Sequence, residues 1–389
     1  MADDARIPVE EYPKRLERLR AQMKRRGLDA LLLGTGMNLA YFSGYPSPAK
    51  NVSRPYFLLL PLRGDPVFIS HSGHKAEAAR FSWIADVREY TELSRVPVEL
   101  IADAMRERSV FGKNVGMELG FEQTLDISHL EFCRLGDALG ETNLVDASGV
   151  LWQLRMIKSP HEIACLREAC RITAESYAAT FSEAREGMLE REIFNAMYRR
   201  LNRPDTGSIF LVITSGKRNY DLVTKPPEDR PVERGDMVWM DAGVTVSGYW
   251  SDFSRAGVVG DPTKAQVHAQ QTVHRITTDA VRMVRPGVKA SDIARFCYAR
   301  LDELDFPITS SIAKLAVRIG HGVGLNLTEP PHIGVHDDTP LEAGMVITLE
   351  PGVATEWGTF HVEENVLVTV DGYEVLSESP RELWRIALA

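Results

Sequence analysis

Apolar positions in the N-terminal part of the chain alternate between a helical period and short continuous runs. Residues 10–26 place Leu16, Leu19 and Met23 on one helical face, and Gly27 follows as a helix stop. The remaining patterns predict a strand over residues 30–33, a hairpin over 56–62 and 66–70, helices near 73–82, 98–108 and 126–137, and strands near Val87 and Val115. This alternation predicts a small α/β domain with a mixed sheet over residues 1–155.

A domain boundary is expected near residue 155, where a connecting helix over residues 151–158 meets a new helix start. Ser159 is a good N-cap, Pro160 suits the first helical turn, and Glu162 completes a capping box. Helices are predicted from there to about residue 186 and over residues 189–201, 264–284 and 291–303. With short apolar strands between and after them, residues 156–389 are expected to form an α+β domain, its helices on one face of an antiparallel sheet.

Two stretches of this second domain have the same sequence pattern, and both contain acidic residues. Residues 233–243 and 342–352 each contain a turn glycine, a short apolar run, one acid and a closing glycine. A second acid follows the first by 11 residues in one case and by 13 in the other, and a histidine lies between the two pairs. These residues are Asp241, Asp252, His321, Glu350 and Glu363, with Glu364 as the alternative to Glu363. The repeat indicates two related half-domains whose carboxylates converge.

A single acid in such a turn is most often a solvated loop residue. Asp241 and Glu350, however, each end a run that is too apolar for a surface edge, so their carboxylates are expected to be buried and to need a cation. Four carboxylates and one imidazole suit two divalent ions such as Mn, Co or Zn, roughly 3.5–4 Å apart. Such a pair lowers the pKa of a shared water and polarises a carbonyl, which favours hydrolysis of an amide or related C–N bond.

In this interpretation each predicted ligand has its own place around the two ions. Asp241 would reach one ion, His321 and Glu350 would hold the other, and Asp252 and Glu363 would bridge them. The alternative, a fold of this kind retained as a binding module, gives no reason for the chain to keep five such ligands.

Composition restricts the possible partners. The 389 residues carry a net charge of −9, which argues against nucleic acid or an anionic membrane as the main partner. No signal peptide is visible, and no apolar run approaches the roughly 20 residues of a membrane span. Four cysteines without a CxxC pair suggest reduced thiols and a cytoplasmic protein.

The acid and histidine motifs resemble those of the pita-bread metallohydrolases, the family of methionine aminopeptidase, aminopeptidase P, prolidase and creatinase. The motifs are Asp-Ala-Gly at 241–243, Ser-Asp-x-Ser-Arg at 251–255, Gly-His-Gly-Val-Gly-Leu at 320–325, Leu-Glu-Pro-Gly-Val at 349–353 and Val-Glu-Glu-Asn at 362–365. Residues 15–20, 27–32, 38–44 and 157–159 are similar to the N-terminal motifs of the creatinase and prolidase type. The resemblance implies a creatinase-like N-terminal domain, a pita-bread catalytic domain with pseudo-twofold halves, two Mn, Co or Zn ions, a homodimer, and Glu363 rather than Glu364 as ligand.

The chain departs from the proline-peptidase pattern where that pattern has other polar side chains. Thr328 stands where those peptidases carry a histidine, residues 215–229 contain no histidine, and His361 replaces an arginine two residues before the last ligand. His332, His336 and His361 are candidates to supply the lost imidazole; exposed loop histidines are the plainer interpretation of the first two.

The expected function is therefore hydrolysis of an amide or related C–N bond, with Xaa-Pro dipeptidase as the best single label. A small non-peptide metabolite, such as a cyclic amidine or a modified amino acid, is the alternative substrate, and the missing histidines favour it.

Overall fold

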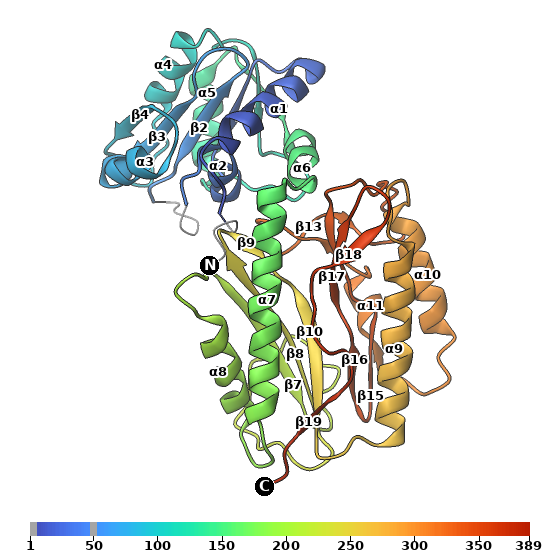
Figure 1. Cartoon of the computed structure of the whole chain (residues 1–389). Helices are drawn as coiled ribbons and strands as arrows, with labels where there is room; N and C mark the ends of the chain where they lie inside the picture. Colours follow the sequence, from blue (N-terminus) through green and yellow to red (C-terminus); the bar gives the residue numbers. More distant parts are fainter. Residues whose placement is uncertain (1–5, 47–52) are drawn as a thin grey trace. The chain divides into compact units, whose positions relative to one another are not determined.

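The computed structural model describes residues 6–46 and 53–389, and within them the chain forms two compact units. One unit spans residues 7–155 and the other residues 156–389, and each has its own hydrophobic core (Figure 1). The first five residues of the segment in which we expect no signal peptide lie outside the described residues.

The first unit is built on one six-stranded sheet with the order β4-β3-β2-β1-β5-β6. Strand β1 pairs antiparallel with β2 and parallel with β5, so the predicted mixed sheet is confirmed. Its strands are β1 (Ala30–Leu33), β2 (Phe57–Pro61), β3 (Val67–His71), β4 (Asp86–Tyr90), β5 (Asn114–Met117) and β6 (Asn143–Asp146). Its helices are α1 (Glu11–Arg26), α2 (Gly36–Ser43), α3 (Lys75–Phe81), α4 (Val98–Glu107), α5 (His129–Leu139) and α6 (Ser148–Met156).

The predicted helix stop of this unit is confirmed, but helix α2 was not predicted. Leu16, Leu19 and Met23 are buried along α1, and Gly27 ends that helix with a φ of 67°. Helix α2 buries five of its eight residues, so it lacks the polar face that gives a helix its sequence period.

The second unit contains five helices among its described residues: α7 (Pro160–Glu183), α8 (Glu190–Leu201), α9 (Lys264–Met283), α10 (Ala290–Asp302) and α11 (Ile312–Ala316). Its strands are β7 (Ile209–Ser215), β8 (Met237–Val246), β9 (Tyr249–Trp250), β10 (Phe253–Val259), β11 (Ser310–Ser311), β12 (His321–Gly322), β13 (Glu329–His332), β14 (Val346–Leu349), β15 (Gly352–Thr355), β16 (Gly358–His361), β17 (Glu364–Val368), β18 (Tyr373–Val375) and β19 (Trp384–Ile386).

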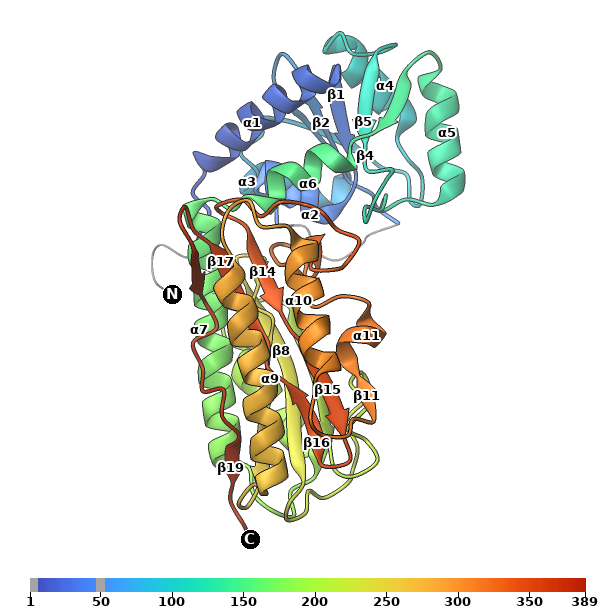
Figure 2. The ribbon, with the colours of Figure 1, turned by 90° about the vertical axis from the view of Figure 1, so that its right-hand side faces the viewer.

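One order of elements occurs twice in this unit, a pair of helices followed by antiparallel strands. The first half comprises α7 and α8 with β7, β8 and β10, and the second comprises α9 and α10 with β14 to β17. Both long helices open with a capping box, Ser159 with Glu162 in α7 and Thr263 with Gln266 in α9. Helices α7 and α8 pack on β8 and β7, whereas α9 packs on β14 and β16 and lies beside α10 (Figures 1 and 2). Among the described strands of this unit, β10 and β19 form the one parallel pair.

The strands that carry the acids begin alike and end differently. Gly235 and Gly344 precede them with φ values of 85° and 93°, a backbone conformation that glycine adopts at little cost. Strand β8 continues through Asp241 without a break, so this acid ends the apolar run of residues 237–240 but does not end the strand. Glu350 does follow the end of β14, because Pro351 has no N–H to continue the ladder.

The capping box of α7 joins the first turn of this helix to the residue before it. The Ser159 hydroxyl accepts from the Glu162 amide at 3.3 Å, and the Glu162 carboxylate accepts from the Ser159 amide at 2.7 Å. Ser159→Ala should lower the stability of the second unit by about 1 kcal/mol, because a helix-terminal N–H loses its partner. Denaturant unfolding would measure this, with the exposed Ser182→Ala as the control. Equal midpoints for the two variants would show that the cap contributes nothing.

Candidate metal centre

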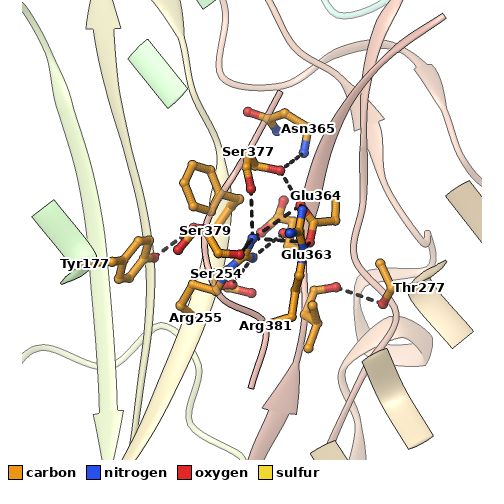
Figure 3. A network of polar contacts seen from close by, with 12 residues as sticks. Tyr177, Ser254, Arg255, Thr277, Glu363, Glu364, Asn365, Ser377, Ser379 and Arg381 are labelled. Atoms are coloured by element: carbon orange, nitrogen blue, oxygen red, sulfur yellow. Dashed lines mark hydrogen bonds and ion pairs between the residues drawn. The ribbon is translucent and has the colours of Figure 1, made fainter. Parts of the chain in front are cut away.

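Two of the predicted ligands, Asp241 and Asp252, come from the first half of the unit. Asp241 lies on β8 opposite Ser254 of β10, and Asp252 is the residue just before β10. The Tyr177 hydroxyl of α7 lies 3.0 Å from the carbonyl oxygen of Met240 and 2.8 Å from that of Phe253, so one side chain fixes the backbone next to both acids. Figure 3 shows the hydroxyl of this tyrosine directed toward the polar residues around Ser254 and Arg255.

The other three, His321, Glu350 and Glu363, come from the second half. The Nδ1 of His321 lies 3.0 Å from the Gly322 carbonyl oxygen, which can only accept, so Nδ1 carries the hydrogen. The lone pair of Nε2 therefore faces the acids, at 3.5 Å from both the Asp252 and the Glu350 carboxylates. A hydrogen bond of 2.7 Å from the Glu350 amide to the Ile319 carbonyl holds the two segments together.

The donor atoms form two groups that share one residue. Ligand atoms of Asp252, His321 and Glu363 lie within 4.8 Å of one another, and so do those of Glu350, His361 and Glu363. Asp241 belongs to neither group, but it lies close enough to Glu350 and Glu363 for the charges of the three carboxylates to act on one another. The structure thus brings four predicted ligands into these groups with Asp241 beside them, and it places Glu363 rather than Glu364 among them.

Two buried carboxylate oxygens show whether these residues fit a cation. Neither Asp241 Oδ1 nor Glu363 Oε2 has a hydrogen-bond partner among the described residues. A buried carboxylate oxygen left in that state costs free energy, and a cation removes the cost. Oxygen donors with one imidazole are ligands that divalent Mn, Co and Zn accept, so the residues fit such ions.

The pKa values of the acids reflect the same crowding. Burial raises the pKa of Asp252 and of Glu363 well above the usual range, and the charges of neighbouring carboxylates add to the effect. Burial likewise raises the pKa of Asp241 to about 6. Burial acts in the same direction on Glu350, but contacts with His361 and His321 outweigh it and lower the pKa of that acid. The acids therefore repel one another unless positive charge is placed among them.

His361, predicted as a catalytic residue, lies inside this cluster. Its Nε2 lies 3.0 Å from the carbonyl oxygen of Glu350, which can only accept, so Nε2 carries a hydrogen and acts as a donor. Its Nδ1 lies 3.0 Å from the Ser254 hydroxyl. A Cβ at Gly352 would approach the ring to 2.4 Å, so the closing glycine of the second motif leaves room for this imidazole.

Thr328, which occupies the position of the peptidases' histidine and is a candidate catalytic residue for that reason, and His332 share a neighbour that the sequence did not reveal. The guanidinium of Arg318 lies 3.4 Å from the Thr328 hydroxyl and 3.5 Å from Nδ1 of His332. His332 is partly buried on β13, in register with His321, so the exposed-loop interpretation is wrong for it and right for His336. Arg318 stands three residues before His321, a position from which the sequence offered no chemical motif.

A polar network outside the cluster supports it (Figure 3). The main-chain N–H of Asp252 donates to the Asn365 side chain at 2.9 Å. Arg255 donates to the Glu363 carbonyl at 2.8 Å and to the Glu364 carboxylate at 3.2 Å, and Arg381 donates to the same carboxylate at 2.8 Å. Residues of β10 thereby fix the backbone on either side of Glu363, while Glu364 faces the two arginines.

The fold and this cluster together define a class of protein, a two-unit metal-dependent hydrolase. A family model described as the Creatinase/Prolidase N-terminal domain matches residues 15–157, and one described as metallopeptidase family M24 matches residues 164–370. The chain belongs to metallopeptidase family M24, whose members use divalent metal ions.

Individual relatives agree over nearly the whole length. The chain is 30% identical over 376 residues to an Xaa-Pro dipeptidase of Pyrococcus furiosus, covering 95% of this chain and 99% of that one. Among solved structures, dipeptidase PepE from Mycobacterium ulcerans has a TM-score of 0.80 at 26% identity, covering 98% of this chain and 100% of that one. The prolidase from Pyrococcus horikoshii has a TM-score of 0.80 at 25% identity, and the match covers 95% of this chain and 99% of that one. Among the described residues no helix has the length and apolarity needed to cross a membrane.

The network predicts that replacing two glutamates that lie close together in the sequence lowers the free energy of unfolding by different amounts. The Glu364 side chain is 5% exposed and pairs with the buried Arg255, whereas Glu374 is 43% exposed and pairs with Arg167 on the surface. Glu364→Gln should destabilise the second unit by about 3 kcal/mol, because it leaves a buried guanidinium without a counter-charge. Glu374→Gln should cost less than about 1 kcal/mol. Denaturant unfolding compares the two, and equal shifts would contradict a supporting role for this network.

Proposed function

We propose that this protein is a metal-dependent Xaa-Pro dipeptidase of the prolidase type. The observation that carries the proposal is the convergence of carboxylate and imidazole donors around Glu363, the one residue common to both groups, since two ions held side by side need a carboxylate that both can reach. The two groups show this convergence and are not themselves the two ion sites. The named activities of the relatives from Pyrococcus furiosus and Pyrococcus horikoshii support the choice of substrate.

In this proposal each predicted ligand has a definite place. Asp241 would hold one ion, His321 and Glu350 would hold the other, and Asp252 and Glu363 would be shared between them. The resident ions are Mn²⁺, with Co²⁺ and Zn²⁺ as alternatives. When bound, they would supply an acidified water and polarise the carbonyl of the scissile bond.

The remaining candidates act through hydrogen bonds. His361 donates from Nε2 to the Glu350 main chain, which holds this acid toward the centre. Thr328 and His332 lie at the guanidinium of Arg318, where a substrate beside His321 would meet them. His332 is the first candidate for the imidazole donor that Thr328 lacks, should turnover of Xaa-Pro dipeptides prove ordinary.

The proposal extends to the organisation of the whole protein. Residues 1–155 are the creatinase-like N-terminal domain, and residues 156–389 are the catalytic domain. We further propose a cytoplasmic homodimer. None of its four cysteines, all of them among the described residues, forms a disulfide, and Cys165, Cys170 and Cys297 are buried thiols, which suits a reducing compartment.

A second candidate function has its own support. Thr328 stands in place of a histidine, and residues 215–229 contain none. Both features fit a hydrolase of a small non-peptide amide, such as a cyclic amidine or a modified amino acid. A panel of such compounds beside Xaa-Pro dipeptides separates the two candidates.

Removing a shared ligand tests the centre itself. Asp252→Ala should lose both ions and all activity, because a ligand that reaches both ions serves both sites. Metal content after loading with Mn²⁺ and dialysis measures the loss. Asp261→Ala is the matched control, since the Asp261 side chain is 83% exposed and remote from the cluster in its contacts. An Asp252→Ala variant that retains two ions per chain would remove this acid from the ligand set.

Replacing Thr328 tests whether Xaa-Pro dipeptides are the substrate. Wild-type turnover of Xaa-Pro dipeptides should fall well below the roughly 10 per second that is ordinary for an enzyme. Thr328→His should raise it about a hundredfold, because a donor aimed at the developing oxyanion contributes on the order of 3 kcal/mol. His336→Gln, on an exposed residue nearby, is the control and should leave turnover unchanged. A fall in turnover for Thr328→His would mean that another residue, with His332 first, already fills the role.

A further inference from the structure

The second unit contains a buried ion pair outside the donor groups of the metal centre. The Lys158 ammonium lies 3.3 Å from Oε2 of Glu329, and the two side chains are 1% and 0% exposed. Among the carboxylates of residues 6–46 and 53–389, Glu329 is the one with which this ammonium forms an ion pair. Glu329 directly follows Thr328 in the sequence. The pair therefore joins the start of the second unit to the loop that carries Thr328.

The free energy of folding gives a poor reason for such a pair. Moving two charges out of water costs free energy that their attraction only roughly returns, and apolar side chains of the same volume are often as stabilising. An ammonium and a carboxylate attract one another strongly only at short range, so the pair restricts the two segments to one arrangement. Its contribution is therefore expected in the geometry of the segments that it joins.

The Glu329 carboxylate organises the loop between β12 and β13. Its Oε1 accepts from the Asn326 amide at 3.0 Å, while its Oε2 lies at the Lys158 ammonium. A Cβ at Gly324 would approach Oε2 to 2.6 Å, so this glycine leaves room for the carboxylate to lie against the loop. One carboxylate thus holds both the loop and the cation.

This loop influences where His321 stands. Strand β12 consists of two residues, His321 and Gly322, and it pairs with β13 on one side and with β14 on the other. In the ladder with β13, Gly322 lies opposite Glu329 and His321 lies opposite His332. A strand of two residues has few ladder hydrogen bonds of its own, so its place in the sheet depends on its neighbours. Displacement of Glu329 would therefore move the His321 imidazole.

The main chain of Lys158 binds the other neighbour of β12. Its amide donates to the Gly344 carbonyl at 2.9 Å. Gly344 lies in the turn before β14, the strand that ends just before the proposed ligand Glu350. Lys158 thereby contacts both segments that enclose β12, β13 through its side chain and the start of β14 through its main chain.

We propose that Lys158 is a positioning residue of the metal centre, and that its ion pair with Glu329 holds β13 against β12 and so sets the place of His321. The inference deepens the proposed function and rests on it for the identity of the bound ions, although not for the packing of the loop. Groups that orient a ligand from outside change metal affinity by about tenfold to a hundredfold. Loss of the pair is therefore expected to weaken the ion that His321 holds.

Calorimetric titration of the full chain with Mn²⁺ tests the assignment. Lys158→Met keeps the length of the side chain without its charge, and Glu329→Gln keeps the shape without the carboxylate. Each variant should bind one of the two ions about tenfold to a hundredfold more weakly, and the other ion with less than about a twofold change. Lys289→Met is the matched control, because Lys289 pairs with Asp338 at 3.2 Å but is 50% exposed, and it should bind both ions as the wild type does. Undiminished binding of both ions by Lys158→Met, or equal weakening of the two, would overturn the assignment.

The double variant Lys158→Met/Glu329→Gln separates position from stability. Each single change leaves a buried charge without this partner and destabilises the unit, whereas the double variant contains neither charge and should recover most of the stability. Its affinity for the weakened ion should nevertheless equal that of the single variants, because both changes remove one and the same contact. Wild-type affinity for both ions in the double variant, or losses that add, would contradict a positioning role. If circular dichroism shows Lys158→Met to be unfolded, the double variant alone provides the comparison.

Hydrogen exchange separates this inference from the proposed function. Without added metal, the amides of residues 320–332 should exchange about tenfold faster in the double variant than in the wild type, since a lost contact between charged groups is of this order, while those of β7 and β8 keep their rates. If the wild type takes up no Mn²⁺ and cleaves no dipeptide, the proposed function fails, and this local increase still upholds the role of the pair. Unchanged exchange at residues 320–332, or an equal increase throughout the unit, would overturn it.

Discussion

Mutual repulsion among buried carboxylates is the constraint on which this structure depends. Two strand systems deliver Asp241, Asp252, Glu350 and Glu363 to one place, where burial and their like charges raise the pKa of three of them. Such an arrangement is favourable when cations lie among the acids or when some of the acids are protonated. The strands supply the acids and, as we propose, divalent ions supply the charge that lets the two halves meet.

The surroundings of the cluster hold it rigid from outside. Tyr177 binds the backbone next to Asp241 and Asp252, Asn365 binds the main chain of Asp252, and Arg255 binds that of Glu363. Each of these contacts joins segments that are far apart in the sequence. Because the donor atoms are fixed before any ion binds, less free energy is spent on ordering them, which is a general condition for tight and selective sites.

Much of this was accessible from the sequence, because the signals are local. Capping residues such as Ser159, the turn glycines 235 and 344 and the spacing of the acids identified the elements and the residues that the structure brings together. Helix α2 was missed because it is buried on most sides, and Asp241 was placed at a strand end because its apolar run is followed by a glycine. Arg318 could not be found, since only the folded chain sets it against Thr328 and His332.

One shared carboxylate, Glu363, is central to the proposed centre, because it holds the two ions side by side. The most direct test is the electron paramagnetic resonance spectrum of the wild-type protein during titration with Mn²⁺. Two ions roughly 3.5–4 Å apart with a bridging carboxylate interact magnetically, so we expect uptake of two ions per chain with the spectrum of a coupled pair. Uptake of a single ion, or of two ions whose spectra remain those of isolated Mn²⁺, would contradict a shared carboxylate.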